Sequence, residues 1–194
     1  MKNILVIFLL MSSLVAYAQI DENHLQIGEK APIIKGVDQF GKTINSKDIL
    51  KEKQLLLVFY RGGWCPSCRK HLTELEQSFD AFSKKGFYVV VVTPESVEKT
   101  KETSEKIKAS FSIIHDVDNK IMTDYKVLYE INEQNVTNYF DIIKKKVMEY
   151  NVDNNLVLPV TATYIINKKG KISFVQYNPD YTKRADFNEM LKSL

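Results

Sequence analysis

The chain has 194 residues, of which 44% are hydrophobic and 26% charged, and its formal net charge is only +3 at pH 7. Lys, Arg, Asp and Glu are interspersed along its whole length. This pattern argues against binding to nucleic acid or to a membrane surface. Since no linker-like stretch or internal repeat divides the sequence, we expect one domain with its own hydrophobic core.

Residues 1–18 have the features of a secretory signal peptide. Lys2 is followed by an apolar run from Ile4 to Val15 and by a small-x-small triplet that ends at Ala18. The run is shorter than the roughly 20 residues of a membrane-spanning helix, and no nearby cysteine could carry a lipid. The sequence therefore predicts cleavage after Ala18, no stable membrane anchor, and an exported, periplasmic domain over residues 19–194.

The domain is expected to begin with a hairpin around residues 39–42, followed by a short helix capped by Ser46. Residues 54–60 (QLLLVFY) and 87–93 (FYVVVVT) are apolar runs typical of strands buried on both faces. Between them, from Pro66 onward, apolar residues recur every three or four positions, which predicts an amphipathic helix. These residues are Cys68, Leu72, Leu75, Phe79 and Phe82.

The middle of the chain continues the alternation of helices and strands. We expect a charged helix over 95–109, a strand at 112–116 and a helix over 120–128. A further helix over 133–150 is predicted as an insertion over the sheet, because four apolar residues share one face. They are Val136, Tyr139, Ile143 and Val147.

The last part predicts a hairpin and a closing helix. Residues 163–167 and 171–177 are strand-like and flank a turn at Gly170, and residues 185–194 carry a helical apolar pattern. Strand, helix, strand in this order implies right-handed parallel crossovers. With two such crossovers, the sequence predicts an α/β fold, a thioredoxin-like three-layer sandwich with a helical insertion.

The only two cysteines, Cys65 and Cys68, lie within one helical turn in the segment 58–69, VFYRGGWCPSCR. A disulfide between them closes too short a loop to stabilise the fold much, which favours a redox role over a structural one. Both lie where a buried strand ends and a helix begins. The unpaired amides and dipole of a helix N-terminus favour a thiolate over a thiol.

The two cysteines are expected to differ in role. Cys65 precedes the first helical turn beside Gly63 and Trp64, where a substrate can approach, whereas Cys68 belongs to the buried stripe. We therefore predict that Cys65 attacks and Cys68 resolves. Arg61 is either an ordinary surface arginine or a catalytic group that holds an oxygen-bearing substrate. Trp64 either packs in the core or forms the contact surface beside Cys65.

Other readings of the cysteine pair are weaker. A zinc site would need His24, His71 or His115 as additional ligands, and His71 is expected to be a solvated helix residue. A c-type haem would need histidine at position 69, which is Arg69. An inert core pair is disfavoured by the position at a helix start. No metal or cofactor is expected.

The sequence around the dithiol resembles the peroxiredoxin-like branch of the alkyl hydroperoxide reductase and thiol-specific antioxidant (AhpC/TSA) family, within the thioredoxin fold. The most specific stretch is FYRGGWCPSC (59–68). VVVVTPES (89–96), LPVTATYIINKKGKISF (158–174) and YNPDYTKRAD (177–186) extend the likeness. The resemblance implies an antioxidant enzyme that reduces hydrogen peroxide and organic hydroperoxides, with thioredoxin-type proteins as its reductant.

The peroxide-binding motif of the family is not reproduced. Ordinary peroxiredoxins carry PxxxTxxC, in which the Thr and a distant Arg orient the peroxide. With Cys65 as the reactive thiol, the Pro and Thr positions hold Val58 and Gly62; with Cys68, they hold Arg61 and Cys65. An exported thiol-disulfide reductase acting on protein disulfides therefore stays open as the alternative, and a metal-binding or partner-binding module as the non-enzymatic one.

Two residues that thioredoxins have near the dithiol are different in this chain. The buried carboxylate six residues before their first cysteine is replaced by Phe59, and the position of their cis-proline holds Thr161, with Pro159 two residues earlier. Either Pro159 serves from a shifted position or the substrate groove differs; we expect Pro159, Thr161, Gly63 and Trp64 to contact the substrate.

Overall fold

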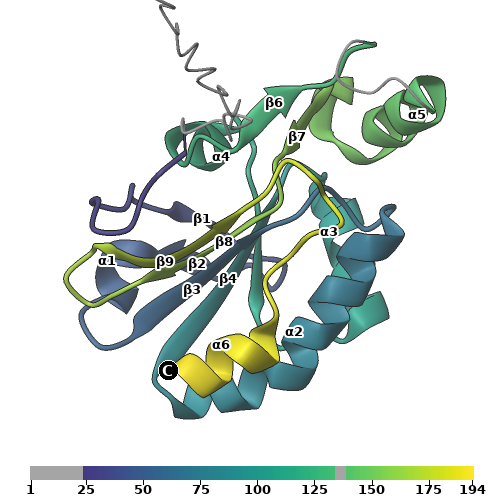
Figure 1. The fold of residues 1–194 in the computed structure, drawn as a ribbon. Helices are drawn as coiled ribbons and strands as arrows, with labels where there is room; N and C mark the ends of the chain where they lie inside the picture. The colour runs from purple at the N-terminus through teal and green to yellow at the C-terminus, as the bar shows by residue number, and fades with distance from the viewer. Residues whose placement is uncertain (1–23, 134–138) are drawn as a thin grey trace, which may run out of the picture.

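The computed structural model describes residues 24–133 and 139–194, so the predicted signal peptide and Val136 lie outside the described residues. Its centre is a mixed five-stranded sheet with the order β5-β4-β3-β8-β9 (Figure 1). The strands are β3 (Gln54–Phe59), β4 (Phe87–Thr93), β5 (Ser112–His115), β8 (Ala162–Ile166) and β9 (Ile172–Tyr177). The first three are parallel, and β8 and β9 are antiparallel to their neighbours. Both predicted crossovers and the hairpin are confirmed.

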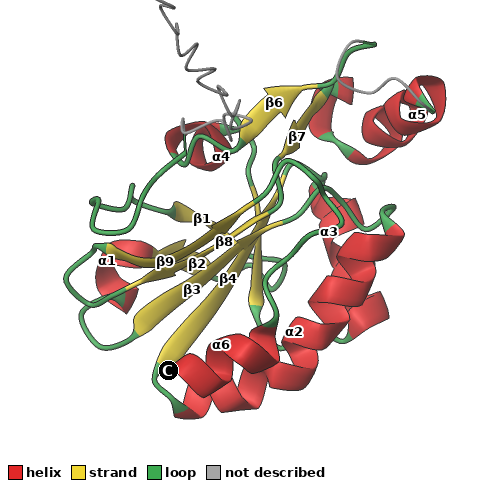
Figure 2. Cartoon of the chain, in the orientation of Figure 1, coloured by secondary structure: helices red, strands yellow, loops and turns green. Residues whose placement is uncertain are grey.

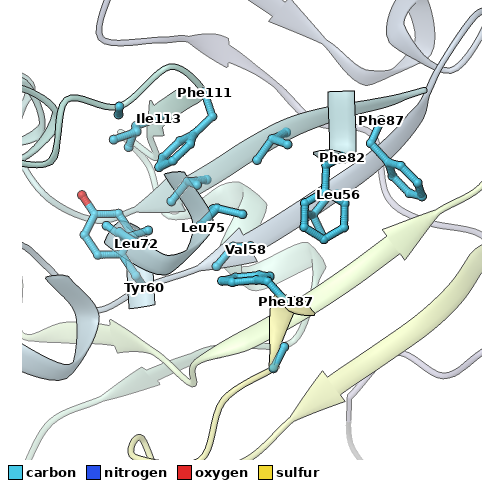
Figure 3. Close-up of a cluster of buried hydrophobic side chains, with 14 of the residues drawn as sticks. Leu56, Val58, Tyr60, Leu72, Leu75, Phe82, Phe87, Phe111, Ile113 and Phe187 are labelled. Atoms are coloured by element: carbon cyan, nitrogen blue, oxygen red, sulfur yellow. The ribbon is translucent and has the colours of Figure 1, made fainter. Parts of the chain in front are cut away.

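One face of this sheet is covered by α2 (Pro66–Lys84) and α6 (Phe187–Ser193), which lie side by side (Figure 1). The even-numbered residues of β3, Leu56 and Val58, point toward them and pack with Leu72 and Phe187 (Figure 3). α3 (Val97–Ile107) lies beside α2 and β5. The predicted apolar stripe of α2 therefore faces the core.

The opposite face is covered by smaller elements (Figure 2). The odd-numbered residues of β3, such as Leu55 and Leu57, pack with Ile34, Ile44 and Met122. These come from the segment around the hairpin and from a short helix. The elements are β1 (Lys35–Val37), β2 (Thr43–Asn45), α1 (Ser46–Ile49) and α4 (Lys120–Asp124). The predicted three-layer α/β class is confirmed.

Two local predictions are wrong. The N-cap of α1 is Asn45, whose side chain accepts from the Lys47 amide, whereas the hydroxyl of Ser46 accepts from the buried Ile34 amide. The helix expected over 120–128 ends earlier, because Lys126 adopts a left-handed φ of 55° that a helix does not continue through. The chain then forms β6 (Leu128–Glu130), which pairs with β7 (Val157–Pro159).

The insertion helix is α5 (Phe140–Tyr150), followed by the 3₁₀ turn η1 (Val152–Asn154). It does not cover the five-stranded sheet as predicted. Its Val147 and Ile143 pack with Ile131 and Leu158, next to the β6 and β7 pair (Figure 1). Tyr139 precedes the helix and is exposed. In the described part of the chain, no helix has the length and apolar character needed to cross a membrane.

Candidate active site

A glycine pair shapes the loop between β3 and α2. Gly62 has a φ of +147°, a backbone conformation that L side chains rarely adopt. At Gly63, an added Cβ would lie 2.0 Å from the Thr103 hydroxyl on α3. The loop can approach α3 this closely only with glycine at that position. This packing explains why Gly-Gly precedes the cysteines.

The loop delivers Cys65 to the N-cap of α2, with Pro66 as the first helical residue. The Cys65 carbonyl oxygen accepts hydrogen bonds from the amides of Cys68 and Arg69, and these are the first hydrogen bonds of the helix. Both cysteines are free thiols, and their side chains approach to 3.2 Å. Cys65 is 3% exposed, whereas Cys68 is completely buried. The dithiol lies at the helix start, as the sequence predicted, but Cys65 is buried rather than open to a partner.

The two thiols have opposite electrostatic settings. A hydrogen bond from the Cys68 thiol, supported by the Cys68 amide and the charges of Arg61 and Arg184, lowers the pKa of Cys65 to about 6. Burial raises the pKa of Cys68 well above that of an ordinary thiol. One proton is therefore shared by the pair, and at neutral pH Cys65 carries the negative charge.

Two arginines flank the dithiol. The side chain of Arg184, which the sequence did not single out, donates from Nη2 to Cys68 Sγ at 3.4 Å, across 116 positions of the chain. Arg61 is only 4% exposed, so the prediction of an ordinary surface arginine is excluded. Its guanidinium carbon lies 4.5 Å from the ring centre of Tyr181 and 5.2 Å from that of Trp64.

Glu95 is a second residue that the sequence did not single out. This buried carboxyl at the end of β4 accepts from the Tyr60 hydroxyl and, at 2.7 Å, from the Gly63 amide. Arg69 donates to the Gly63 carbonyl at 2.5 Å. Burial raises the pKa of Glu95 to about 7. The Gly63 amide, predicted to border the substrate, is therefore engaged by Glu95 and holds the loop in place.

His71 is not the solvated residue that the helix pattern suggested. It is buried, stacks on Phe187 with a centroid distance of 4.5 Å, and its Nε2 lies 3.0 Å from the Ala185 carbonyl oxygen. Burial lowers its pKa to about 4, so the ring is neutral at pH 7 and donates to the carbonyl. His71 thereby fixes the segment next to Arg184.

The remaining predicted site residues lie in different settings. Trp64 is half-buried and packs against two hydrophobic clusters, one of which contains Cys65. Pro159 is buried in β7, where it pairs with Leu128. Thr161 is buried and its hydroxyl has no hydrogen-bond partner. Within residues 24–133 and 139–194, no hydrogen bond links Pro159 or Thr161 to the dithiol, and no peptide bond is cis.

A metal site is not assembled around the cysteines. Among the residues that the structure describes, no group of three or more His, Cys, Asp and Glu side chains could hold a metal ion. The histidine nearest in sequence, His71, uses Nε2 for the Ala185 carbonyl. The described geometry supplies a thiolate, a second thiol and two cations, which is chemistry for an electrophilic oxygen or sulfur.

Comparison with known families now decides the assignment. A model of the AhpC/TSA family matches residues 27–175. The chain belongs to this family. It is accordingly an antioxidant oxidoreductase of the peroxiredoxin type, with the thioredoxin-like fold that the sheet order and helix layers had indicated.

Curated relatives are distant. The chain is 25% identical over 167 residues to the chloroplastic peroxiredoxin Q of Populus jackii, covering 86% of this chain and 67% of the relative. It is 29% identical over 108 residues to the putative peroxiredoxin bcp of Coxiella burnetii, covering 56% and 71%. Over 108 residues it is 30% identical to the thiol-disulfide oxidoreductase ResA of Bacillus cereus, covering 55% and 61%.

Solved structures agree at the level of the fold. The crystal structure of the peroxidoxin BcpB from Mycobacterium tuberculosis superposes with a TM-score of 0.69 at 16% identity, covering 88% of this chain and 99% of that one. A cysteine-to-serine mutant of peroxiredoxin 6 from Arenicola marina gives the same TM-score of 0.69 at 18% identity, covering 87% and 71%.

Proposed function

We propose that the protein is a dithiol peroxidase in which Cys65 attacks the peroxide and Cys68 resolves the product. The observation that carries this proposal is the preassembled pair: thiols at 3.2 Å, with the pKa of Cys65 lowered to about 6 and that of Cys68 raised. Because the pair already lies in contact, formation of a Cys65–Cys68 disulfide needs little movement of α2.

The reaction balances with groups that the site provides. The Cys65 thiolate sulfur bonds to the terminal peroxide oxygen, the O–O bond breaks, and the departing alkoxide or hydroxide takes up a proton. Cys65 is then a sulfenic acid. The Cys68 sulfur attacks it, the sulfenic hydroxyl and the Cys68 proton leave as water, and a disulfide remains. A thioredoxin-type dithiol returns two electrons and restores both thiols.

A disulfide substrate is the second candidate. Without the PxxxT residues, the described site has few donors aimed at a peroxide oxygen, whereas disulfide exchange needs only a thiolate and a resolving thiol. Cys65 would attack one sulfur and displace the other as a thiolate, and Cys68 would then attack the Cys65 sulfur of the mixed disulfide, release the bound sulfur as a second thiol and leave a Cys65–Cys68 disulfide. The ResA relative, named as a thiol-disulfide oxidoreductase, supports this candidate.

The cellular setting is part of the proposal. The signal-like residues 1–18 motivate export to the periplasm, with hydroperoxides or protein disulfides as substrates and a thioredoxin-type protein as the electron donor. The mass of the protein isolated from its natural host would test the export. A mature chain beginning at Gln19 is expected, and a full-length cytoplasmic product would contradict it.

Stopped-flow fluorescence tests the chemistry directly. Trp64 is the only tryptophan and lies next to Cys65, so its emission should change when the pair is oxidised. We expect reduced protein to react with hydrogen peroxide measurably but slowly, and with a small disulfide at least as readily. Peroxide oxidation far faster than disulfide exchange would remove the second candidate, and no oxidation by either would refute both.

A further inference from the structure

Arg61 is a buried cation without a carboxylate partner in the described structure, and the Cys65 thiolate is the anion beside it. It is 4% exposed, its Nε has no hydrogen-bond partner, and no described carboxylate forms an ion pair with it. Its side chain instead lies against the rings of Trp64 and Tyr181. An isolated charge removed from water is costly unless another charge compensates it.

Arg184 also has unpartnered nitrogens and lies against the dithiol. Its Nη2 donates to Cys68, while Nε and Nη1 are buried without a partner. Arg184 also lines a groove of about 580 Å³, together with Ser67 of the CPSC segment, Lys70 and Thr182. Two carboxylates line the same groove but are already engaged. Glu74 Oε1 lies 3.9 Å from Lys70 Nζ. Asp186 Oδ1 accepts hydrogen bonds from the amides of Asn188 and Glu189 in the first turn of α6.

The charges around the dithiol therefore do not balance. The Cys65 thiolate supplies one negative charge against two guanidinium groups. The buried carboxyl of Glu95 accepts from Tyr60 and Gly63, and no hydrogen bond or ion pair among the described residues links it to either arginine. One positive charge stays uncompensated beside the reactive sulfur, in an interior where charges are weakly screened.

We propose that this excess charge forms an anion-binding site, so that the protein selects substrates carrying a carboxylate next to the reactive O–O or S–S bond. Arg184 contacts the carboxylate from the groove wall, and Arg61 adds its charge from the interior. The proposal rests on the proposed function only in that the substrate reacts at Cys65.

A pair of alkylating reagents tests the charge preference without any redox chemistry. Iodoacetate and iodoacetamide react with the same thiolate and differ in that one carries a carboxylate. The ratio of their rates at Cys65, mapped by peptide mass, is compared with the ratio for N-acetylcysteinamide, a neutral thiol. We expect the protein's ratio to be at least about tenfold higher and to fall as salt is added.

Matched variants assign the effect to the two arginines. Arg61→Gln and Arg184→Gln should each lower the iodoacetate preference several-fold, and Arg61→Lys should keep most of it because the charge remains. Lys183→Gln removes the same charge from the exposed residue next to Arg184 and should leave the ratio unchanged. If Lys183→Gln and Arg61→Gln lowered the iodoacetate preference equally, the preference would reflect the general charge of the protein, and the proposed anion-binding site would be refuted.

Substrates complete the test. A carboxylate-bearing hydroperoxide and its methyl ester are compared in single turnovers of the reduced wild-type protein, and the acid should react about tenfold faster. In one outcome, the ester oxidises the protein at least as fast as the acid, while the ratio of iodoacetate to iodoacetamide rates equals that of N-acetylcysteinamide. This result would refute the anion-binding site and leave the proposed peroxidase activity intact. A raised alkylation ratio without oxidation by either compound would refute the peroxidase and leave the anion site standing.

Discussion

The candidate active site has two halves that differ in how the chain supplies them. Residues 61–68 are continuous and provide both cysteines, Arg61 and the loop. The other half comes from far away: Arg184 lies 116 positions from Cys68, and Glu95 lies 32 positions from Gly63. The continuous half supplies the two sulfurs and one cation, while the distant half supplies the second cation and the carboxyl that holds the loop.

The largest expected effect comes from the continuous half. Cys65→Ser removes the sulfur whose pKa is lowered to about 6, and it should reduce turnover by about three orders of magnitude or more, to background. Cys68→Ser should allow the first attack but not resolution, so mixed disulfides with disulfide substrates should accumulate. Non-reducing electrophoresis with mass spectrometry detects these adducts.

The same pair of variants can reverse the assignment of roles. Mixed disulfides trapped by Cys65→Ser and absent from Cys68→Ser would make Cys68 the attacking thiol, with Arg184 as the cation beside it. In that case a residue of the distant half, Arg184, would donate a hydrogen bond to the attacking sulfur itself.

The next effect tests the distant half. Arg184 donates to Cys68 Sγ, and its charge favours the Cys68 thiolate, so Arg184→Gln should slow disulfide formation from the Cys65 sulfenic acid by about a hundredfold. Dimedone, which captures sulfenic acids, should label Cys65 more strongly in the variant than in the wild type. A first oxidation step slowed as much as the second would instead assign Arg184 to the attack.

The sequence predicted the continuous half well and the distant half poorly. A Pro at the first helical position, a buried strand before it and a helical apolar stripe after it are local signals, and they located Cys65 and Cys68 correctly. No local pattern joins Arg184 to the cysteines, because the contact depends on how α6 and the preceding segment dock on α2. The two parallel crossovers and the hairpin were likewise predictable from the buried strands.

The errors have the same physical origin. His71 lies one position from the apolar stripe of α2 and was expected in solvent, but α6 docks on that side and buries it against Phe187. Glu95 follows a strand of valines, where an acidic residue is most often exposed. Its burial depends on the approach of the Gly63 loop to α3, which no stretch of sequence encodes alone.

Glu95 gives a smaller effect that appears in the pH dependence of stability. Its pKa rises from 4.5 to about 7 on folding, so the folded state binds more protons between these values, and stability is lost as pH rises through this window. The contribution is on the order of 3 kcal/mol. In Glu95→Gln this loss is absent, so the unfolding free energy should be higher at pH 7, relative to its value at pH 4.5, than it is in the wild type. Urea titrations across this range measure it, and an unchanged slope would contradict the buried carboxyl.

His71 gives the counterpart on the side of Arg184, and its sign is opposite. Its pKa falls from 6.5 to about 4 on folding, so the unfolded chain binds the extra proton, and stability is lost as pH falls through this window. His71→Gln keeps a donor for the Ala185 carbonyl but cannot titrate. Without the rise in stability that His71 contributes between about pH 4 and 6.5, the unfolding free energy of this variant should fall more steeply with rising pH than that of the wild type, whereas in Glu95→Gln the rise from His71 remains alone. Because the two contributions overlap and oppose in the wild type, only the single variants separate them, and a His71→Gln profile with the same slope as the wild type would mean that folding does not lower the pKa of His71.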